Sequence, residues 1–427
     1  MHIYFLSLLS AILIAASSGQ AAAVNEANPT TSLVVADSAT TAISHRSTLE
    51  KALYAPGYLA YLPFHLFFSA SKFAASAVWE QRALDRVKAL LTTADGRLGI
   101  RPLSSTDIGS GVRIFARDLA GSSHIGATSS WGASQGRQHH TLSLAWPHQR
   151  LAGVHGRLYA RFDREPKESF YGIGNDTQKS SKGAFSNTQT QIALEFNRSH
   201  RHILHFNGGL GYRRVAIAMG RSSSVPSADR IHSGEKLLGW GQSSDFAEAH
   251  IDARAQFVDR PGSPTRGYRT RARLGYSHSL DQAKLSHWAL RLSSEYFFEL
   301  FYRRILSLQL GSDWRWAPGA DRIPFYELAY LGGSEVLRAE RRGRFRDHGT
   351  AYAALHYRYP VWKMIEGHLF SESGRVFAQP QDFTLDNWHR SYGFGLRLWV
   401  PQGLIFEQLI AFGTGSPKVY FSFKSDF

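Results

Sequence analysis

Arginine side chains recur at alternate positions in several stretches of this 427-residue chain. In the stretch 154–162, Arg157 and Arg161 alternate with Leu158 and Ala160, so the guanidinium groups share one face of an extended strand. Guanidinium groups gathered on one face attract anions or pair with carboxylates. The six arginines that we assign to such a face are Arg157, Arg161, Arg269, Arg271, Arg273 and Arg397.

Other residues that could carry chemistry do not form a recognised catalytic or metal site. The segment 132–136 matches G-x-S-x-G, but it lies between two alternating stretches, whereas a nucleophile elbow requires a strand-to-helix turn. Histidines without an acidic ligand at metal spacing are His139, His140, His200, His202 and His205. There is no cysteine, no P-loop and no dinucleotide fingerprint. We therefore expect no enzyme activity, no catalytic residue, no metal and no cofactor.

The stretches that carry these residues alternate apolar and polar positions from residue 96 to residue 427. Several, such as 266–279 and 284–297, are longer than the roughly five or six residues usual in soluble sheets. A soluble sandwich would bury the apolar faces, whereas a transmembrane barrel turns them to lipid and turns the arginines to a polar lumen. We predict an all-β fold, a 16-stranded antiparallel transmembrane β-barrel over 96–427, preceded by a short amphipathic helix.

The predicted strands alternate short and long connections. They span 96–103, 110–118, 124–133, 138–148, 151–163, 184–196, 202–214, 244–256, 266–279, 284–297, 300–316, 350–360, 363–377, 389–400, 403–413 and 418–427. Tight connections such as 401–402 follow even strands, and long ones such as 215–243 and 317–349 follow odd strands. This parity is what an even-stranded outer-membrane barrel requires when both chain ends lie on the periplasmic side.

Three further segments precede the predicted barrel. Residues 1–23 resemble a secretory signal peptide, with an apolar stretch over 4–16 and an A-x-A cleavage site at 21–23. Residues 24–62 are typical of a flexible linker. Residues 63–95 contain an amphipathic helix, which either packs on its own domain or lies in the membrane interface.

The amino-acid composition and the C-terminal residues indicate the class of protein and its cellular location. The hydrophobic content of 43% excludes disorder, and the mean hydropathy of -0.26 excludes a polytopic helical membrane protein. The net charge of +15 is spread along the chain, so we expect no nucleic-acid partner. Phe421, Phe423 and Phe427 resemble the C-terminal strand signal of bacterial outer-membrane barrels. We expect integration in the bacterial outer membrane, with its lipids, lipopolysaccharide and the cell's barrel assembly machinery as partners.

Four segments in order resemble a known family. The segment 326–338, followed by the basic 341–347, is similar to the aromatic, GG(S/A), (V/L)RG(F/Y) loop of the bacterial surface antigen family. That family is the barrel domain of the BamA/TamA and two-partner-secretion superfamily. Segments 171–176, 264–268 and 370–377 resemble its yGiGn, P-x-x-G-Y and f-x-D-x-G-x-v-f patterns. The motif glycines are Gly172, Gly174, Gly267, Gly332, Gly333 and Gly374.

The resemblance implies that the loop 317–349 folds back into the lumen, where Arg338 pairs with Glu372. Glu372 stands where the family pattern has aspartate. Inside a partly dehydrated lumen, a guanidinium is favoured only with a carboxylate partner. Arg338 is followed by Ala339 and Glu340, where the family has glycine and an aromatic residue. The alternative is that Arg338 is one more solvated arginine of this loop.

The resemblance, which covers roughly residues 55–427, also implies a function. The implied function is insertion or translocation of outer-membrane proteins or lipids. It would use a weak seam between the first and last strands and a mobile inward loop. An unfolded polypeptide is one candidate partner. The residues before the first predicted strand contain no paired strands, so we expect a member without periplasmic modules. The alternative function is a passive pore or surface receptor, whose arginine-lined lumen would favour anions if it is open.

Overall fold

The computed structural model describes most of the chain from residue 91 onward. The described residues are 91–106, 109–119, 123–132, 136–147, 153–201, 203–220, 222, 224–232, 237–281, 284–362, 364–400 and 403–423. The predicted signal peptide, the linker, residues 63–90 of the helical segment and Phe427 lie outside them. Among the residues that are described, no helix is long and apolar enough to cross a membrane.

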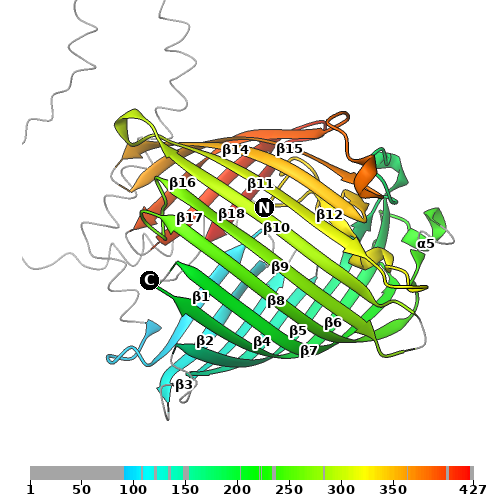
Figure 1. Cartoon of the computed structure of the whole chain (residues 1–427), viewed down its shortest axis with the longest axis horizontal. Helices are drawn as coiled ribbons and strands as arrows, with labels where there is room; N and C mark the ends of the chain where they lie inside the picture. Colours follow the sequence, from blue (N-terminus) through cyan, green and yellow to red (C-terminus); the bar gives the residue numbers. More distant parts are fainter. Residues whose placement is uncertain are drawn as a thin grey trace, which may run out of the picture. The chain divides into compact units, whose positions relative to one another are not determined.

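Sixteen antiparallel strands of the described residues close into a barrel, with each strand tilted along the wall (Figure 1). They are β1 (Leu98–Ser105), β2 (Gly109–Leu119), β3 (Ser123–Gly132), β4 (Arg137–Pro147), β5 (Val154–Phe170), β6 (Gly183–His200), β7 (Leu204–Met219), β8 (Ser243–Val258), β9 (Gly267–Ser279), β10 (His287–Glu299), β11 (Ile305–Trp316), β14 (Gly349–Trp362), β15 (Ile365–Phe377), β16 (His389–Val400), β17 (Gly403–Phe412) and β18 (Lys418–Phe423). The predicted 16-stranded all-β barrel is confirmed.

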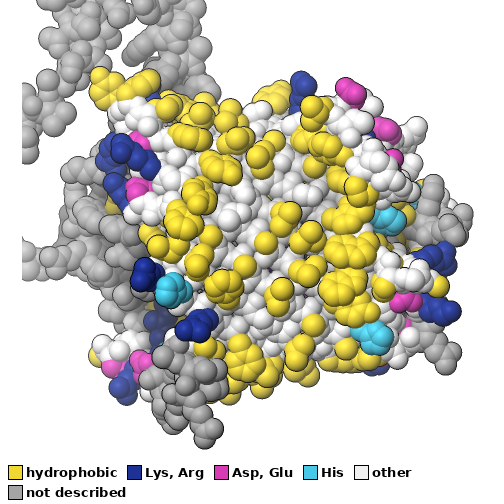
Figure 2. Space-filling view, in the orientation of Figure 1, with side chains coloured by type: hydrophobic (Ala, Val, Ile, Leu, Met, Phe, Trp, Pro, Cys, Tyr) yellow, Lys and Arg dark blue, Asp and Glu magenta, His cyan; other side chains and the backbone are white. Residues whose placement is uncertain are grey.

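Strand pairing turns alternate residues outward and inward. The outward side chains of Leu158, Ile192 and Leu210 are exposed although they are large and apolar. The inward side chains of Tyr159 and Arg213 are buried. Figure 2 shows hydrophobic side chains over the middle of the wall and charged side chains toward its two ends. Such a band satisfies every backbone group by strand pairing and presents an apolar surface to hydrocarbon.

Three details differ from the sequence prediction. Strands at the middle of the chain are longer, since β6 has 18 residues where 184–196 was expected. Its added positions lie outside the apolar alternation on which the prediction depends. Two strands of three residues each, β12 (Ala329–Leu331) and β13 (Phe345–Asp347), pair with one another in the connection between β11 and β14. Segments this short contain too few alternations to be recognised in a sequence.

The structure also differs from the prediction at residues 92–95, the end of the predicted helical segment 63–95. Thr92 forms an antiparallel bridge with Gly99, and the backbone N–H of Gly96 donates to the Thr93 carbonyl at 2.8 Å. Gly96 has a φ of 67°, in the left-handed region that glycine tolerates. Residues 92–95 therefore belong to a turn that leads into β1, and they are not helical.

The two ends of the barrel differ in their connections. Long connections join β5 to β6, β7 to β8, β11 to β14 and β15 to β16, and we call this side the long-loop end. The opposite side, where β14 passes to β15 within a few residues, is the short-turn end. At the long-loop end, a buried cluster packs strand residues against loop residues; it includes Phe170, Phe185, Phe246, Leu237 and Phe325. This packing joins the connections that follow β7 and β11 to the ends of the neighbouring strands.

Candidate functional site

The connection 317–348, which we call the inward loop, packs against the inner face of the barrel. Its hairpin β12–β13 contributes Leu331 and Phe345 to a buried cluster with Val376 of β15. Gly332 and Gly333 have φ values of 102° and 122°, and a Cβ on Gly332 would lie 2.2 Å from the Arg341 carbonyl oxygen. Only glycine fits this close approach. The hairpin of the loop therefore packs against β15.

The tip of the inward loop is bound by Glu372. This residue faces inward from β15 and is 1% exposed. The Arg338 guanidinium makes an ion pair with Oε1 of Glu372, and the backbone N–H of Arg338 donates to Oε2 at 2.8 Å. The Nε of Arg338 donates to the Ser334 carbonyl at 2.9 Å, and its guanidinium lies over the Phe370 ring. The structure thus places these two residues in contact, which the solvated-arginine alternative does not describe.

The next two residues connect the tip to the last strands. The backbone N–H of Ala339 donates to the Ser391 hydroxyl of β16 at 2.8 Å. The Tyr420 hydroxyl of β18 donates to the Arg338 carbonyl at 2.8 Å, and the Thr414 hydroxyl donates to Glu340 at 2.9 Å. A glycine and an aromatic residue are absent here, yet Ala339 still packs in a buried cluster with Leu409 and Ala411.

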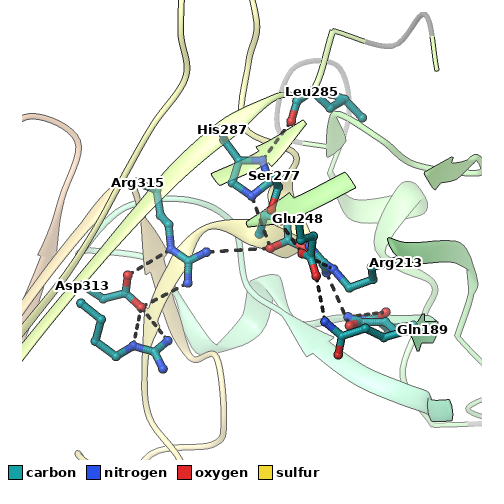
Figure 3. Close-up of polar contacts among 12 residues, drawn as sticks. Gln189, Arg213, Glu248, Ser277, Leu285, His287, Asp313 and Arg315 are labelled. Atoms are coloured by element: carbon teal, nitrogen blue, oxygen red, sulfur yellow. Dashed lines mark hydrogen bonds and ion pairs between the residues drawn. The ribbon is translucent and has the colours of Figure 1, made fainter. Parts of the chain in front are cut away.

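A second carboxylate, Glu327, attaches the first part of the inward loop to the barrel wall. Figure 3 shows side chains of the wall that surround this position, among them Arg213, Glu248, His287 and Arg315. Glu327 ends the short 3-10 turn Phe325–Glu327, and its Oε1 accepts a 2.6 Å hydrogen bond from Arg213 of β7. Arg213 also donates to Glu248 of β8 at 2.7 Å. His287 lies 3.6 Å and Arg315 lies 3.8 Å from the second oxygen of Glu327. Side chains from four strands therefore meet at this junction.

The surroundings of Glu327 favour its charged form. Burial alone would raise the pKa of this carboxyl. Arg213 and His287, through charge and hydrogen bonds, more than offset burial and hold the pKa well below its usual range. Sequence reasoning did not single out Glu327, although it lies in the quoted family segment 326–338. Its partner Arg213 is 114 residues away and carries no motif.

A third set of contacts joins the inward loop to β5. Arg346 of β13 is 1% exposed and pairs with Glu168, which also accepts a 3.1 Å hydrogen bond from Asn187. Arg342 lies 3.1 Å from Glu165. The loop is therefore attached at its beginning, tip and end to different parts of the wall.

The other motif glycines occupy positions that disfavour a side chain, through a positive φ, through crowding, or through both. Gly172 and Gly174 have φ values of 101° and 111°, and the backbone N–H of Gly174 donates to the Arg346 carbonyl at 2.8 Å. A Cβ on Gly267 would lie 1.9 Å from the Phe257 carbonyl oxygen. A Cβ on Gly374 would lie 3.0 Å from Leu331 of the inward loop. Gly174 and Gly374 thus bring backbone close to the loop, and Gly267 lies in the wall.

The six predicted lumen arginines lie apart from the inward loop. Three bind carboxylates of neighbouring strands, namely Arg269 with Glu295, Arg271 with Asp252 and Arg397 with Glu407. Arg157 and Arg161 lie over the ring of Tyr159, with centroid distances of 5.0 and 5.4 Å. Arg273 faces Asp252 in the strand register. Among the described residues, the ion pairs and ring contacts of these arginines are with residues of the barrel strands, so they differ from the ion pairs that hold the loop.

The histidines show no metal constellation within the described residues. No group of three or more histidine, cysteine, aspartate or glutamate side chains there could hold a metal ion. His139 contacts Asp163 on the next strand, and His140 Nδ1 lies 2.8 Å from the Ser129 hydroxyl. These contacts join neighbouring strands. Ser134 of the G-x-S-x-G segment and His202 lie outside the described residues.

At the end of the described chain, Phe421 points outward from β18 and is exposed, while Phe423 pairs with Ser104 of β1 and Phe406 of β17. β1 and β18 share only two register pairs among the described residues, Ser104 with Phe423 and Ser105 with Ser422. By comparison, β1 and β2 share eight. The backbone N–H of Thr106 also donates to the Phe421 carbonyl at 3.0 Å. We call this contact between β1 and β18 the seam.

Together, the apolar outer wall, the closed barrel and the bound inward loop define a class of transmembrane β-barrel whose lumen holds one of its own loops. A family model described as the Omp85 superfamily domain matches residues 125–407, more than half of the chain. The chain belongs to the Omp85 superfamily. The resemblance drawn from the sequence motifs is confirmed.

Solved structures agree with this assignment. The fold is similar to BamA from Haemophilus ducreyi lacking POTRA domains 1–3, with a TM-score of 0.60 and 14% identity over 76% of this chain and 69% of that chain. It is also similar to CdiB from Escherichia coli, with a TM-score of 0.52 and 8% identity over 76% and 62%. No curated protein sequence matches the chain. The family and fold point to the bacterial outer membrane.

Proposed function

We propose that this protein inserts or translocates polypeptides at the outer membrane by opening the seam between β1 and β18. The observation that carries the proposal is the contact between β18 and the inward loop, in which the Tyr420 hydroxyl donates to the Arg338 carbonyl at 2.8 Å. β18 lies at the seam, where the first and last strands of the barrel pair, so the closure of the wall is joined directly to the loop.

Contacts of the inward loop support a link between the lumen and the seam. Tyr420 of β18 donates to the Arg338 carbonyl, and Arg338 is itself bound to Glu372 of β15. A displacement of β18 at the seam would therefore act directly on the loop tip. This arrangement suits a barrel that opens at its side.

The passive-pore alternative has less support. A steady pore requires an open lumen, whereas arginine–carboxylate pairs bind the inward loop at three places and the connections at the long-loop end pack into a buried cluster. Three of the six predicted lumen arginines are also neutralised by neighbouring carboxylates. Their field on a permeating anion is correspondingly weaker.

A disulfide across the seam tests the proposal. The chain has no cysteine, so Ser105→Cys with Ser422→Cys creates one defined pair at facing register positions. We expect the oxidised variant in liposomes to lose its acceleration of folding of an unfolded outer-membrane polypeptide, measured by heat-modifiable migration. Reduction should restore it.

The matched control links β1 to its other neighbour. Ser104 and Ser110 face one another across β1 and β2, with hydroxyl oxygens 3.1 Å apart. Oxidised Ser104→Cys with Ser110→Cys should remain active because it leaves the seam free. Equal activity of the oxidised and reduced seam variants would refute lateral opening, and steady anion-selective current in the same liposomes would favour the pore.

A further inference from the structure

Four basic side chains converge at the long-loop end near the start of β18. Lys179 and Lys182 come from the connection between β5 and β6, Arg341 from the inward loop, and Lys418 from the first position of β18. We propose that this basic cluster binds a phosphate group, carried by an outer-leaflet glycolipid or by free phosphate. The proposal concerns a binding site that is separate from the seam and from the Arg338–Glu372 pair.

Direct contacts hold one side of the basic cluster together. The Lys179 ammonium donates to the Thr414 hydroxyl at 2.9 Å and lies 3.7 Å from the Glu340 carboxylate. Thr414 donates in turn to Glu340 at 2.9 Å. The connection between β5 and β6 therefore reaches the turn that precedes β18, and it brings its lysines close to the inward loop.

The charges in the basic cluster are unbalanced. Arg341, Lys179 and Lys182 all repel Lys418 electrostatically, and the attraction that most offsets them comes from Glu340. Glu340, which is 6% exposed, lies 3.7 Å from Lys179 and is the carboxylate that attracts Lys418. Like charges held together raise the local potential and attract a counter-ion of opposite sign.

Lys182 shows the effect of this crowding. Its pKa is lowered by burial and, after that, by the charge of Arg341. A bound anion would favour the charged ammonium and relieve this repulsion.

The basic cluster differs from the other arginines of the inward loop. Arg338, Arg342 and Arg346 each have a carboxylate partner, in Glu372, Glu165 and Glu168 respectively. Among the described residues, no carboxylate lies within ion-pair distance of Arg341, Lys182 or Lys418. These three cations are therefore available to a ligand.

The chemistry of the basic cluster selects phosphate. Lys179 has a side chain that is 50% exposed and Arg341 is exposed, so an anion can approach from the long-loop end. A phosphate monoester carries roughly two negative charges and three acceptor oxygens, which match several separate donors better than a single carboxylate does. In the orientation expected from the connections, with the short turns on the periplasmic side, the long-loop end faces the outer leaflet, which carries lipid A phosphates.

Binding of lipid A to the folded full chain in detergent tests the site. We expect bisphosphorylated lipid A to bind more tightly than its dephosphorylated form, with an affinity that falls as salt is added. Lys182→Gln and Arg341→Gln should each weaken binding of the phosphorylated form about tenfold, the loss expected for one charge-assisted hydrogen bond. Neither should change the affinity for the dephosphorylated form.

Lys284→Gln is the matched control, because Lys284 is an exposed lysine in the connection between β9 and β10. It should bind lipid A as the unchanged chain does, and all variants should show the same heat-modifiable migration. Inorganic phosphate that binds alone, with the same sensitivity to Lys182→Gln and Arg341→Gln, would support the site and identify the free anion as a ligand. Equal affinity for both lipid A forms, or unchanged affinity in both cluster variants, would overturn the proposal.

Discussion

Three arginine–carboxylate pairs join the inward loop to separate strands: Arg338 with Glu372 on β15, Glu327 with Arg213 on β7, and Arg346 with Glu168 on β5. All six side chains are largely buried. Removing two charges from water costs about as much as their attraction returns, so such pairs add little net stability. Breaking one of them is costly, because the partner remains buried and charged. The pairs therefore select the position of the loop.

Arg338→Ala should lower the yield of folded barrel. The substitution leaves the Glu372 carboxylate without its ion pair at a position that is 1% exposed. Breaking a buried pair of this kind costs on the order of 3 kcal/mol. The fraction of protein that migrates as the folded form on an unheated gel measures the effect.

Arg341→Ala is the control for Arg338→Ala, because Arg341 belongs to the same loop and is exposed. It should fold as well as the unchanged chain. If Arg338→Ala showed the same folded fraction as this control, the ion pair would not position the loop.

The lowered pKa of Glu327 predicts that the stability of the folded barrel depends on pH. The pKa of Glu327 in the folded protein lies well below the ordinary value of 4.5, so its contribution is fully present above that value and is lost as pH falls through the folded pKa. At pH 7, Glu327→Gln should lower the unfolding temperature in detergent. The difference from the unchanged chain should shrink as the pH is lowered below about 4.5.

Glu335→Gln tests whether the pH-dependent change in unfolding temperature is specific to Glu327, because Glu335 is an exposed glutamate of the same loop. Its unfolding temperature should follow that of the unchanged chain at every pH. A Glu327→Gln deficit that stayed constant down to pH 3 would mean that the carboxylate charge does not stabilise the loop.

At the scale of elements, the hairpin β12–β13 depends on the backbone at Gly332. A Cβ there would meet the Arg341 carbonyl oxygen at 2.2 Å, and the φ of 102° is strained for any L side chain. Gly332→Ala should therefore displace the hairpin and lower the unfolding temperature of the barrel, as measured in detergent.

Gly319→Ala is the control that separates the effect of side-chain crowding at Gly332 from the effect of a positive φ. Gly319 also has a positive φ, of 57°, but a Cβ there would meet nothing within 4 Å. We expect it to cost only about 1 kcal/mol, the usual penalty for a non-glycine residue in the left-handed region. Equal losses at the two positions would show that close packing at Gly332 is unimportant.

At the seam, the first and last strands of the barrel pair with one another. Among the described residues, Ser104 faces Phe423, Ser105 faces Ser422, and the backbone N–H of Thr106 donates to the Phe421 carbonyl at 3.0 Å. The Tyr420–Arg338 contact joins β18 to the inward loop. A change in pairing at the seam would therefore reach the tip of the loop.

At the scale of the molecule, the positive side chains behind the net charge of +15 lie on different surfaces of the barrel. Part of it lies in the lumen, where Arg269, Arg271 and Arg397 bind carboxylates. Another part lies at the ends of the barrel, outside the apolar band (Figure 2). Placement of charge on inner and end surfaces is what a hydrocarbon environment imposes, because an unpaired charge on the outer wall is costly.

Sequence alternation by itself determined the wall. A residue that faces lipid must be apolar and its neighbour must face the lumen, so period-2 patterning identified sixteen strands and their direction. The prediction was weakest where this requirement ends, as at the longer end of β6 and the turn at residues 92–95. Family motifs added the expected contact between Arg338 and Glu372.

Only the tertiary structure decided how the lumen is occupied. Glu327 and Arg213 are 114 residues apart, and Arg346 and Glu168 are 178 residues apart. Loop residues have no period that assigns them a face, so nothing local relates these charges. Closure of the barrel brings distant strands around one space, and the buried charges in it must then find partners. The seam and the basic cluster near β18 likewise exist only once the cylinder is closed.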